Sequence, residues 1–543
     1  MEAVKPVDFR GAAIACALSL LCAVVSADDP ASPTVQVLNQ GQVILEGAPT
    51  IPPGPAQGIG RFQHTRSNGF AGWSGNRGIY IKTRSGGVNQ LYAVERPGAV
   101  RSRVSSTREA IGEVEKQPGG DLLAFTMSDD GDGFDQIYLL DPGQGESQRL
   151  TDGSSLNNRV VWDGAGQRLA WRSTRRDGRH NDIWLMDIDA PDSVRLVLEA
   201  PDGALWKPIA FDRGGKTLLV QHYASITDSS IYLLDLDNGD LRRLAGNPEA
   251  PSSNIATGFS ADGLGVHFIT NQRDGAAELG WIPLDGSDPI DFVPGNLPWD
   301  VTEFEMSQDG KRGAFVTNEE GISRLYLFDP GNQRYKRVKR TPMGYISGLR
   351  FSPDGRQLGM TISTSQTPSD AFVLELGRRP LSDRKLVRWT FSEVGEWDTS
   401  EFVEPELVHF PAPMITDERT LALPAFYYRP AHATPPYPVI IQVHGGPEGQ
   451  FRPVFDSTIQ MWLDTLGVAV LAPNVRGSLG YGAAYLAMDD GKLRENAVAD
   501  IGALLDWIAD HPDLDENRVA VIGASYGGYM ALASAVHYGD RLR

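Results

Sequence analysis

The chain has 543 residues, too many for one ordinary hydrophobic core, so at least two domains are expected. Its formal net charge of −19 at pH 7 argues against nucleic acid as a partner, because phosphate binding needs clustered lysine and arginine. The 59 glycines and 36 prolines predict many turns and therefore much β structure.

The first feature along the chain is an apolar run at residues 11–25. Lys5 and Arg10 precede it, and small residues ending at Ala27 follow it as a plausible cleavage site. This three-part layout is typical of a secretory signal peptide, so we expect the mature chain to begin at or near Asp28. An uncleaved membrane anchor is the alternative, although the run is short for a membrane span.

Both cysteines, Cys16 and Cys22, lie within the predicted signal peptide, residues 1–27. A mature chain without cysteine has no disulfide, and export without disulfides suits a bacterial periplasm or exterior. We therefore expect a secreted or periplasmic protein with no stable membrane association after signal cleavage.

A unit of about 46 residues then recurs seven times between residues 76 and 383, after an N-terminal lead-in at residues 28–75. Each unit has a turn rich in Gly, Asp and Asn, an apolar strand, a polar stretch and a second strand with an aromatic residue. One apolar position marks the repeat: Ile79, Leu123, Leu169, Leu218, Val266, Ala314 and Leu358. Such a period predicts one four-stranded blade per unit, hence an all-β seven-bladed propeller, with an irregular β-sandwich as the alternative.

Residues 384–405 are acidic and non-repetitive, as expected of a linker. From residue 406 strands alternate with helical patterns, which predicts a parallel sheet flanked by helices. Residues 421–430 alternate like an exposed or edge strand, whereas residues 437–447 and 467–477 contain continuous apolar runs, like buried strands.

Gly523-Ala524-Ser525-Tyr526-Gly527 matches G-x-S-x-G directly after an apolar strand and before a helix-forming run. This is the setting of the nucleophile elbow of α/β-hydrolases, in which a serine on a strained turn attacks a carbonyl carbon. The helix N-terminus beyond the turn favours the negative charge that develops on the attacked oxygen. We therefore predict Ser525 as the nucleophile and the backbone N–H of Tyr526 as one oxyanion donor.

His444-Gly445-Gly446-Pro447 ends an earlier strand of the same predicted sheet. Its two glycines let backbone N–H groups approach a substrate oxygen, so Gly446, and also Gly445, are candidates for the second half of the oxyanion hole. An ordinary strand-ending turn is the alternative. His444 precedes the elbow, which is the wrong order for a triad base, and is expected to shape the loop by hydrogen bonding.

Three segments, VHGGP at 443–447, PNVRGSLGYG at 473–482 and GASYGGYM at 523–530, resemble the prolyl oligopeptidase family in order and spacing, above all its acylaminoacyl-peptidase and dipeptidyl-peptidase branches. The resemblance implies a propeller followed by an α/β-hydrolase domain at residues 406–543, acting by acyl-enzyme chemistry on short peptide or aminoacyl substrates. It implies no cofactor, and the scattered histidines show no metal-ligand spacing. Arg476 and Tyr481 match the family's stretch without a chemical role.

In this fold the triad runs Ser, Asp, His along the chain. Only 18 residues follow Ser525, and His537 and Asp540 lie on or after a helix that leads away from it. We therefore expect the 543-residue chain to hold only the N-terminal half of the hydrolase domain, as a fragment or a truncated gene, and to be inactive alone.

Two other functions remain open, an esterase-type hydrolase and a propeller scaffold with a dead hydrolase remnant. In the family's dipeptidyl peptidases paired glutamates hold the substrate amine. The adjacent Glu319 and Glu320 offer such a pair, but a solvated turn is expected there. Cleavage mode, residue preference and oligomeric state stay open.

Overall fold

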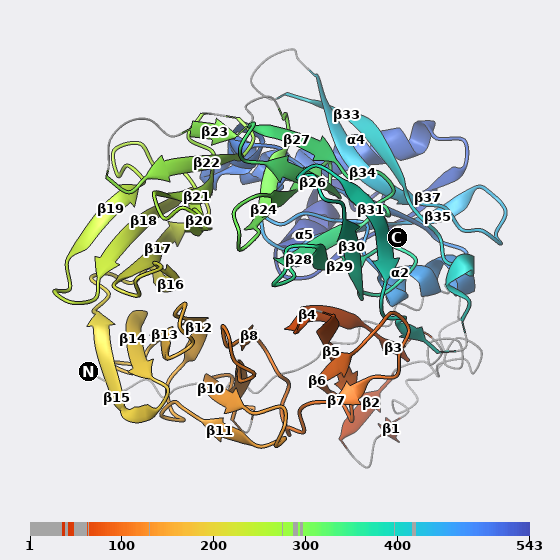
Figure 1. Cartoon of the computed structure of the whole chain (residues 1–543). Coiled ribbons are helices and arrows are strands. Elements are labelled where there is room, and N and C mark those ends of the chain that lie inside the picture. Colours follow the sequence, from red (N-terminus) through yellow and green to blue (C-terminus); the bar gives the residue numbers. More distant parts are fainter. Residues whose placement is uncertain are drawn as a thin grey trace, which may run out of the picture. The chain divides into compact units, whose positions relative to one another are not determined.

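A computed structural model describes residues 35–38, 42–47, 62, 64–75, 77–129, 131–273, 275–285, 291–293, 297–395, 397–414 and 420–543 (Figure 1). The chain divides into two compact units, residues 1–56 and residues 57–543. In the first unit, β1 (Val35–Leu38) and β2 (Val43–Glu46) form an antiparallel hairpin. The predicted signal peptide lies outside the described residues. Within those ranges no helix has the length and apolar character needed to cross a membrane.

The second unit begins with seven four-stranded antiparallel sheets, so the predicted seven-bladed propeller is confirmed. Figure 1 shows the first strand of each sheet nearest the centre of the ring. These inner strands are β4 (Asn68–Ser74), β8 (Val114–Lys116), β12 (Asn157–Trp162), β16 (Leu205–Phe211), β20 (Asn254–Phe259), β24 (Asp300–Met306) and β28 (Tyr345–Phe351). The second strands are β5 (Gly78–Ser85), β9 (Leu123–Ser128), β13 (Arg168–Ser173), β17 (Thr217–Ser225), β21 (Gly265–Thr270), β25 (Gly313–Glu319) and β29 (Gln357–Ser363).

Two further strands complete each blade. The third strands are β6 (Val88–Val94), β10 (Asp135–Leu140), β14 (Asp182–Asp187), β18 (Asp228–Asp235), β22 (Glu278–Pro283), β26 (Ile322–Asp329) and β30 (Asp370–Leu376). The outer strands are β7 (Ser102–Arg103), β11 (Ser147–Arg149), β15 (Ala190–Leu198), β19 (Leu241–Ala245), β23 (Asp291–Val293), β27 (Arg334–Arg337) and β31 (Asp383–Arg388).

The repeat in the sequence reflects the second strand of each blade. All seven marker residues, from Ile79 in β5 to Leu358 in β29, lie there and are fully buried. A second strand is covered by neighbouring blades and paired on both sides, so it needs an apolar residue at this position in every unit. Blade 1 nevertheless begins at Asn68, before the expected residue 76, and blade 7 ends at Arg388 within the expected linker.

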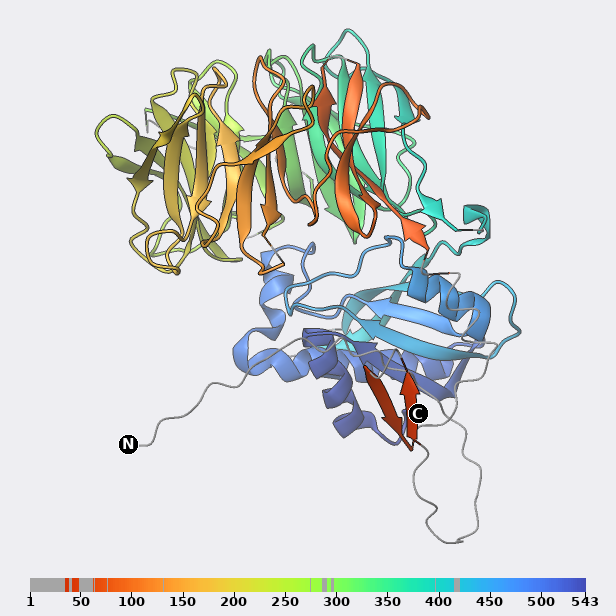
Figure 2. The same cartoon turned by 90° about the horizontal axis from the view of Figure 1, so that it is seen from below.

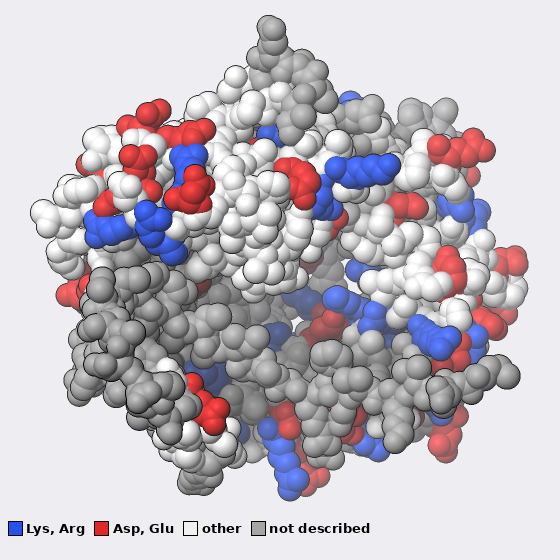
Figure 3. Space-filling model, turned by 180° about the vertical axis from the view of Figure 1, so that it is seen from behind, with Lys and Arg blue, Asp and Glu red and all other residues white. Residues whose placement is uncertain are grey.

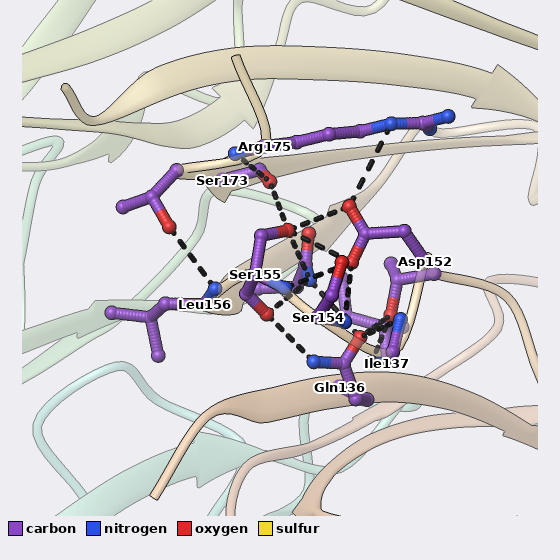
Figure 4. A network of polar contacts seen from close by, with 12 residues as sticks. Gln136, Ile137, Asp152, Ser154, Ser155, Leu156, Ser173 and Arg175 are labelled. Carbon is purple, nitrogen blue, oxygen red and sulfur yellow. Dashed lines mark hydrogen bonds and ion pairs between the residues drawn. The ribbon is translucent and has the colours of Figure 1, made fainter. Parts of the chain in front are cut away.

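Buried polar side chains near the start of third strands tie blades to the segments that follow them (Figure 4). The Gln136 Oε1 atom of blade 2 accepts hydrogen bonds from Thr151 Oγ1 (2.8 Å) and Asn157 Nδ2 (3.1 Å). Asp370 of blade 7 likewise accepts one from Asn68 Nδ2 of blade 1 (3.0 Å). Because blades 1 and 7 exchange no strand, this buried contact helps to close the ring, together with the pair β3 (Thr65–Arg66) and β32 (Glu393–Val394).

The hydrolase part is a five-stranded sheet in the order β33-β34-β36-β35-β37. Its strands are β33 (Glu406–Pro413), β34 (Thr420–Tyr428), β35 (Tyr437–Val443), β36 (Ala469–Pro473) and β37 (Leu514–Gly523). Strand β35 runs parallel to both β36 and β37, whereas β34 runs antiparallel to β33 and β36. The helical segments are η2 (Thr399–Glu401), α2 (Ser457–Met461), η3 (Trp462–Leu466), α3 (Ala483–Leu486), η4 (Ala487–Asp489), η5 (Gly491–Leu493), α4 (Arg494–Asp510) and α5 (Tyr526–Tyr538).

The expectation of an exposed or edge strand at residues 421–430 is wrong. Strand β34 lies between β33 and β36, and its last six residues are all buried. Ala425 and Tyr427 pack in the core that also contains residues of α4 and α5, while Phe426 and Tyr428 pack in a second core on the other face. That second core includes Ile322 of blade 6, so the propeller and the hydrolase part share apolar packing. Figure 2 shows the two parts next to each other.

Candidate active site

Ser525 lies at the sharp turn between β37 and α5, where the sequence predicts the elbow. Its backbone has φ 56° and ψ −121°, a conformation that costs a non-glycine residue about 1–3 kcal/mol. The N–H of Gly528 donates to the Ser525 carbonyl (2.9 Å), and the N–H of Gly527 donates to the Ala524 carbonyl (2.9 Å). Ser525 is exposed, and its side chain makes no capping hydrogen bond to the helix.

The two glycines of G-x-S-x-G allow strand and helix to meet at this turn. A Cβ on Gly523 would lie 2.5 Å from the carbonyl carbon of Gly527. A Cβ on Gly527 would overlap the Val443 carbonyl oxygen at the end of β35 and lie 3.0 Å from that of His444. These obstacles are backbone atoms that no side-chain rotation can move, so both positions require glycine.

The HGGP loop lies directly against the elbow. A Cβ on Gly445 would be 3.4 Å from the Ala524 carbonyl oxygen and 3.7 Å from Ser525 Cβ. Gly446 has φ +154°, and a Cβ there would lie 2.6 Å from the backbone nitrogen of Glu448. The structure therefore brings the predicted nucleophile and the predicted oxyanion loop together.

His444 orients the peptide group that carries the Gly446 N–H. Its Nδ1 atom lies 2.9 Å from the Gly445 carbonyl oxygen, and its Nε2 atom lies 2.9 Å from Ser478 Oγ. Burial lowers the pKa of His444, and the Gly445 carbonyl, which only accepts, favours a proton on Nδ1. In a trans peptide the N–H points opposite to the carbonyl, so this hydrogen bond fixes the direction of the Gly446 N–H.

The RGSLGYG stretch holds the residues after HGGP in place. The Leu479 N–H donates to the Gly449 carbonyl (2.9 Å). Asn474 accepts from the Phe451 N–H (2.7 Å) and donates to its carbonyl (3.1 Å), and its amide also donates to the Tyr481 hydroxyl (2.9 Å). Tyr481 thus has a supporting role that the sequence left unassigned.

Arg476 fixes the same stretch to helix α4. Its side chain is 2% exposed, and its Nε donates to the fully buried Asp500 carboxylate (2.9 Å), which also accepts from the Arg476 backbone N–H (2.9 Å). The Arg476 Nη2 atom donates to the Pro413 carbonyl (3.0 Å) as well. This ion pair joins β33, the RGSLGYG stretch and α4 behind the oxyanion loop.

Asp489 and Arg494 support the elbow, although no sequence motif indicates a role for either. The Tyr526 hydroxyl donates to Asp489 (3.3 Å), Asp489 is ion-paired with Arg494, and the Arg494 guanidinium lies over the Tyr526 ring at 5.3 Å. As the first residue of α5, Tyr526 has a backbone N–H that the helix itself leaves free. The side-chain contacts hold the residue that carries this predicted oxyanion donor.

The propeller contacts the segment that follows HGGP. Arg452 Nε donates to the Gly321 carbonyl (2.9 Å), and Asn318 Nδ2 donates to Gln450 Oε1 (2.8 Å). Blade 6 therefore touches the loop that continues from the candidate oxyanion donors.

The turn that carries Glu319 and Glu320 lies at this contact and is not the solvated turn expected from the sequence. Glu319 is 18% exposed and accepts from the Tyr326 hydroxyl (2.8 Å). Glu320 is 29% exposed and lies 2.7 Å from the ring of His409 in β33. Glu319 is thus held within blade 6, whereas Glu320 contacts β33, which makes the turn part of the contact between propeller and hydrolase.

Two histidines, one on the loop beside the elbow and one on the elbow helix, are engaged elsewhere. His444 contacts Gly445 and Ser478, as above, and His537 on α5 lies 3.2 Å from Glu495 with half of its side chain exposed. In the part of the chain that the structure describes, no group of three metal-binding side chains occurs.

Known proteins resemble this chain in both of its parts. Residues 453–542 match the prolyl oligopeptidase family, and residues 103–380 match the prolyl oligopeptidase N-terminal β-propeller domain. Dipeptidyl-peptidase 5 of Aspergillus fumigatus is 24% identical over 56% of this chain and 43% of its own length. The acylamino-acid-releasing enzyme of Sus scrofa is 30% identical over the same shares of the two chains. The chain thus spans less than half the length of these relatives.

Solved structures agree on the fold. A prolyl endopeptidase structure from a study of two such enzymes superimposes with a TM-score of 0.73 at 14% identity, covering 88% of this chain and 72% of the other. Prolyl oligopeptidase B from Galerina marginata, without ligand, gives a TM-score of 0.69 at 16% identity over 89% and 72%. Propeller, elbow, HGGP loop and both family matches lead to one conclusion: the chain belongs to the prolyl oligopeptidase family.

Proposed function

We propose that this chain is the propeller and nucleophile-bearing part of a serine peptidase that hydrolyses short peptides or aminoacyl substrates. The observation that carries the proposal is the strained Ser525 backbone at the strand–helix turn, with Gly445 of the HGGP loop against it. Strain of this kind at a serine between a parallel strand and a helix is what nucleophile presentation requires.

In the proposed reaction the Ser525 hydroxyl attacks the substrate carbonyl and forms an acyl-enzyme, which water then hydrolyses. The negative charge on the attacked oxygen is stabilised by the N–H groups of Tyr526 and Gly446. His444 holds the Gly446 peptide in direction, and Asp489 and Arg494 hold Tyr526.

A general base must take the proton of Ser525, and a carboxylate must orient that base. The described histidines His444 and His537 are held by other partners, so we propose that the 543-residue chain alone is inactive. A longer gene product, read beyond Arg543, is proposed to supply the base and its partner and to be active.

The names of the relatives support peptides as the substrates that we propose for this chain. One is a dipeptidyl peptidase and another releases acylated amino acids. Blade 6 touches the loop after HGGP, which places the propeller beside the proposed oxyanion hole. We propose that peptides reach Ser525 next to the propeller.

The test is labelling with a fluorophosphonate probe, together with hydrolysis of aminoacyl arylamides, in the 543-residue chain, the longer gene product and its Ser525→Ala variant. The longer product should react, and Ser525→Ala should lower kcat by about 10³-fold or more, as loss of a triad member does. Equal activity of the variant removes Ser525 from its role. Strong labelling of the 543-residue chain contradicts the proposed need for further residues.

We also propose export through the N-terminal segment, with the mature chain beginning near Asp28. N-terminal mass spectrometry of the protein from culture medium or periplasm is the test. An intact Met1 on the exported protein contradicts this proposal.

A further inference from the structure

The inner strand of blade 3 places an arginine on strained backbone. Arg159 lies at a β-bulge of β12, between Asn158 and Val161, with φ 58°. The corresponding bulge of β28 in blade 7 has a glycine, Gly348, with φ 70°. Bulges redirect side chains, and a non-glycine residue at positive φ costs free energy that glycine avoids. The fold therefore accepts strain at Arg159 that it avoids in blade 7.

A glutamate of the neighbouring blade fixes each bulge. Glu113 accepts from the Arg159 backbone N–H (2.7 Å) and pairs with its guanidinium (2.9 Å). Glu303 likewise accepts from the N–H groups of Gly348 (3.1 Å) and Leu349 (2.5 Å). Since the glutamate holds either bulge through backbone N–H groups, the side chain of Arg159 is not required to form it.

Two further cations gather around Arg159. Arg172 of β13 pairs in register with Asn158, the neighbour of Arg159, and β16, which carries Lys207, packs against both β12 and β13. Burial lowers the pKa of Arg172 and of Lys207, and the charge of Arg159 lowers both further. Arg172 Nε is buried without a hydrogen-bond partner, and Glu113 is the carboxylate that raises the pKa of Lys207. The carboxylates that act on this group are Glu113, which is already paired, and Asp135, which acts on Arg172. Three positive charges around one paired carboxylate, two of them partly buried, favour binding of an anion.

This basic group lies at the end of the channel that faces the HGGP loop. Lys207 is on β16, whose first residue Leu205 pairs with Tyr223 of β17. Inner strands begin at the hydrolase end of the channel, because Asp300, the first residue of β24, pairs with Asn318, whose side chain donates to Gln450 (2.8 Å) just beyond HGGP. The carboxylate of Glu448, which directly follows HGGP, also raises the pKa of Tyr223, as burial does. In Figure 3 Lys and Arg side chains, with some Asp and Glu, lie in and beside a hollow near the middle of the view.

We propose that Arg159, Arg172 and Lys207 form a carboxylate-binding site at the hydrolase end of the propeller channel, which selects peptides by an acidic side chain or by their free C-terminal carboxylate. The proposal rests on the peptidase function proposed above and adds a substrate preference to it. A carboxylate here would be a partner for Arg172 and Lys207 and would share Arg159 with Glu113, and a guanidinium binds a carboxylate with two parallel hydrogen bonds.

Binding can be measured without turnover, in the 543-residue chain carrying Ser525→Ala. Four fluorescent octapeptides of one sequence combine Glu or Gln at two positions with a free or amidated C-terminus, and their affinities are compared by anisotropy at 50 and 500 mM salt. We expect carboxylate peptides to bind about 10-fold or more tightly than the neutral one at low salt, with most of the difference lost at high salt. The Glu/Gln arm and the acid/amide arm show which carboxylate is bound.

Three variants locate the site. Arg159→Gly and Lys207→Gln should each lower the affinity for carboxylate peptides several-fold and leave the neutral amide unchanged. Lys216→Gln is the matched control, because Lys216 is a 75% exposed lysine of the same blade at the other end of β17. Equal binding of all four peptides by the unmutated channel overturns the proposal, even where a variant fails to fold. If the longer product shows no Ser525-dependent hydrolysis but the chain still prefers carboxylate peptides, only the proposed peptidase function is refuted and the carboxylate site stands.

Discussion

The candidate active site and the propeller channel each contain an arginine–carboxylate pair, and the two pairs differ in burial. Arg476 and Asp500 behind the oxyanion loop are 2% and 0% exposed, whereas Arg159 and Glu113 in the channel are 51% and 32% exposed. A buried pair must stay together, since a single charge left in the interior is costly, but an exposed pair contributes little to stability. The first pair therefore maintains the site's structure, and the second leaves a cation accessible for a ligand.

The largest expected loss of stability is at the buried pair. Arg476→Met keeps much of the side-chain volume but leaves Asp500 without its cation and the Pro413 carbonyl without its donor. We expect a loss of about 3–5 kcal/mol in the free energy of unfolding, as for other buried pairs with one partner removed. Urea unfolding followed by tryptophan fluorescence measures it.

The double variant Arg476→Met/Asp500→Leu is the control for Arg476→Met. It removes both charges, so it should recover most of the lost stability. A single variant as stable as the unmodified chain contradicts the structural role of this pair.

The elbow, like the buried ion pair, should tolerate substitution less well than the channel bulge, because backbone atoms of β35 pack tightly against it. Gly527→Ala places a Cβ against the carbonyl oxygens of Val443 and His444. We expect about 3 kcal/mol of destabilisation, since β35 and α5 must separate to accommodate it. The matched control is Gly528→Ala, where a Cβ meets only the Gly523 carbonyl oxygen at 3.6 Å. Equal unfolding midpoints in urea for the two variants contradict the tight contact.

Sequence patterns predict the propeller well because each blade consists of four consecutive strands. Every unit therefore repeats the same local demands, as at Leu123 and Leu169. The hydrolase sheet is assembled from strands out of chain order, and β34 gains its partners β33 and β36 from separate segments. Its burial is set by those partners, so alternation within residues 421–430 could not reveal it.

Some residues of the candidate site could likewise be predicted from the sequence, and others could not. Ser525 and the HGGP glycines are visible in the sequence because elbow and loop need particular residues at fixed spacing. Asp489 and Arg494 reach Tyr526 from η4 and α4, and no spacing links them to the elbow. Arg159 could not be predicted for another reason: its proposed role depends on a positive φ angle, which the residue type at that position does not indicate.

The smallest expected effect is at the exposed pair, where Arg159→Gly should not weaken the fold. The variant loses an ion pair that is about half exposed, worth roughly 0–1 kcal/mol. It also relieves the strain of φ 58°, and the equivalent Gly348 shows that the bulge forms around glycine. Glu113 still accepts from the backbone N–H at 159. The two effects oppose each other, so the free energy of unfolding should change by about 1 kcal/mol or less. Urea unfolding of Arg159→Gly measures this beside Arg159→Ala, which loses the same charge but keeps a Cβ at positive φ and should be less stable than the glycine variant. If Arg159→Gly loses several kcal/mol, the arginine is structural, and the strain at this bulge then has a purely architectural cause.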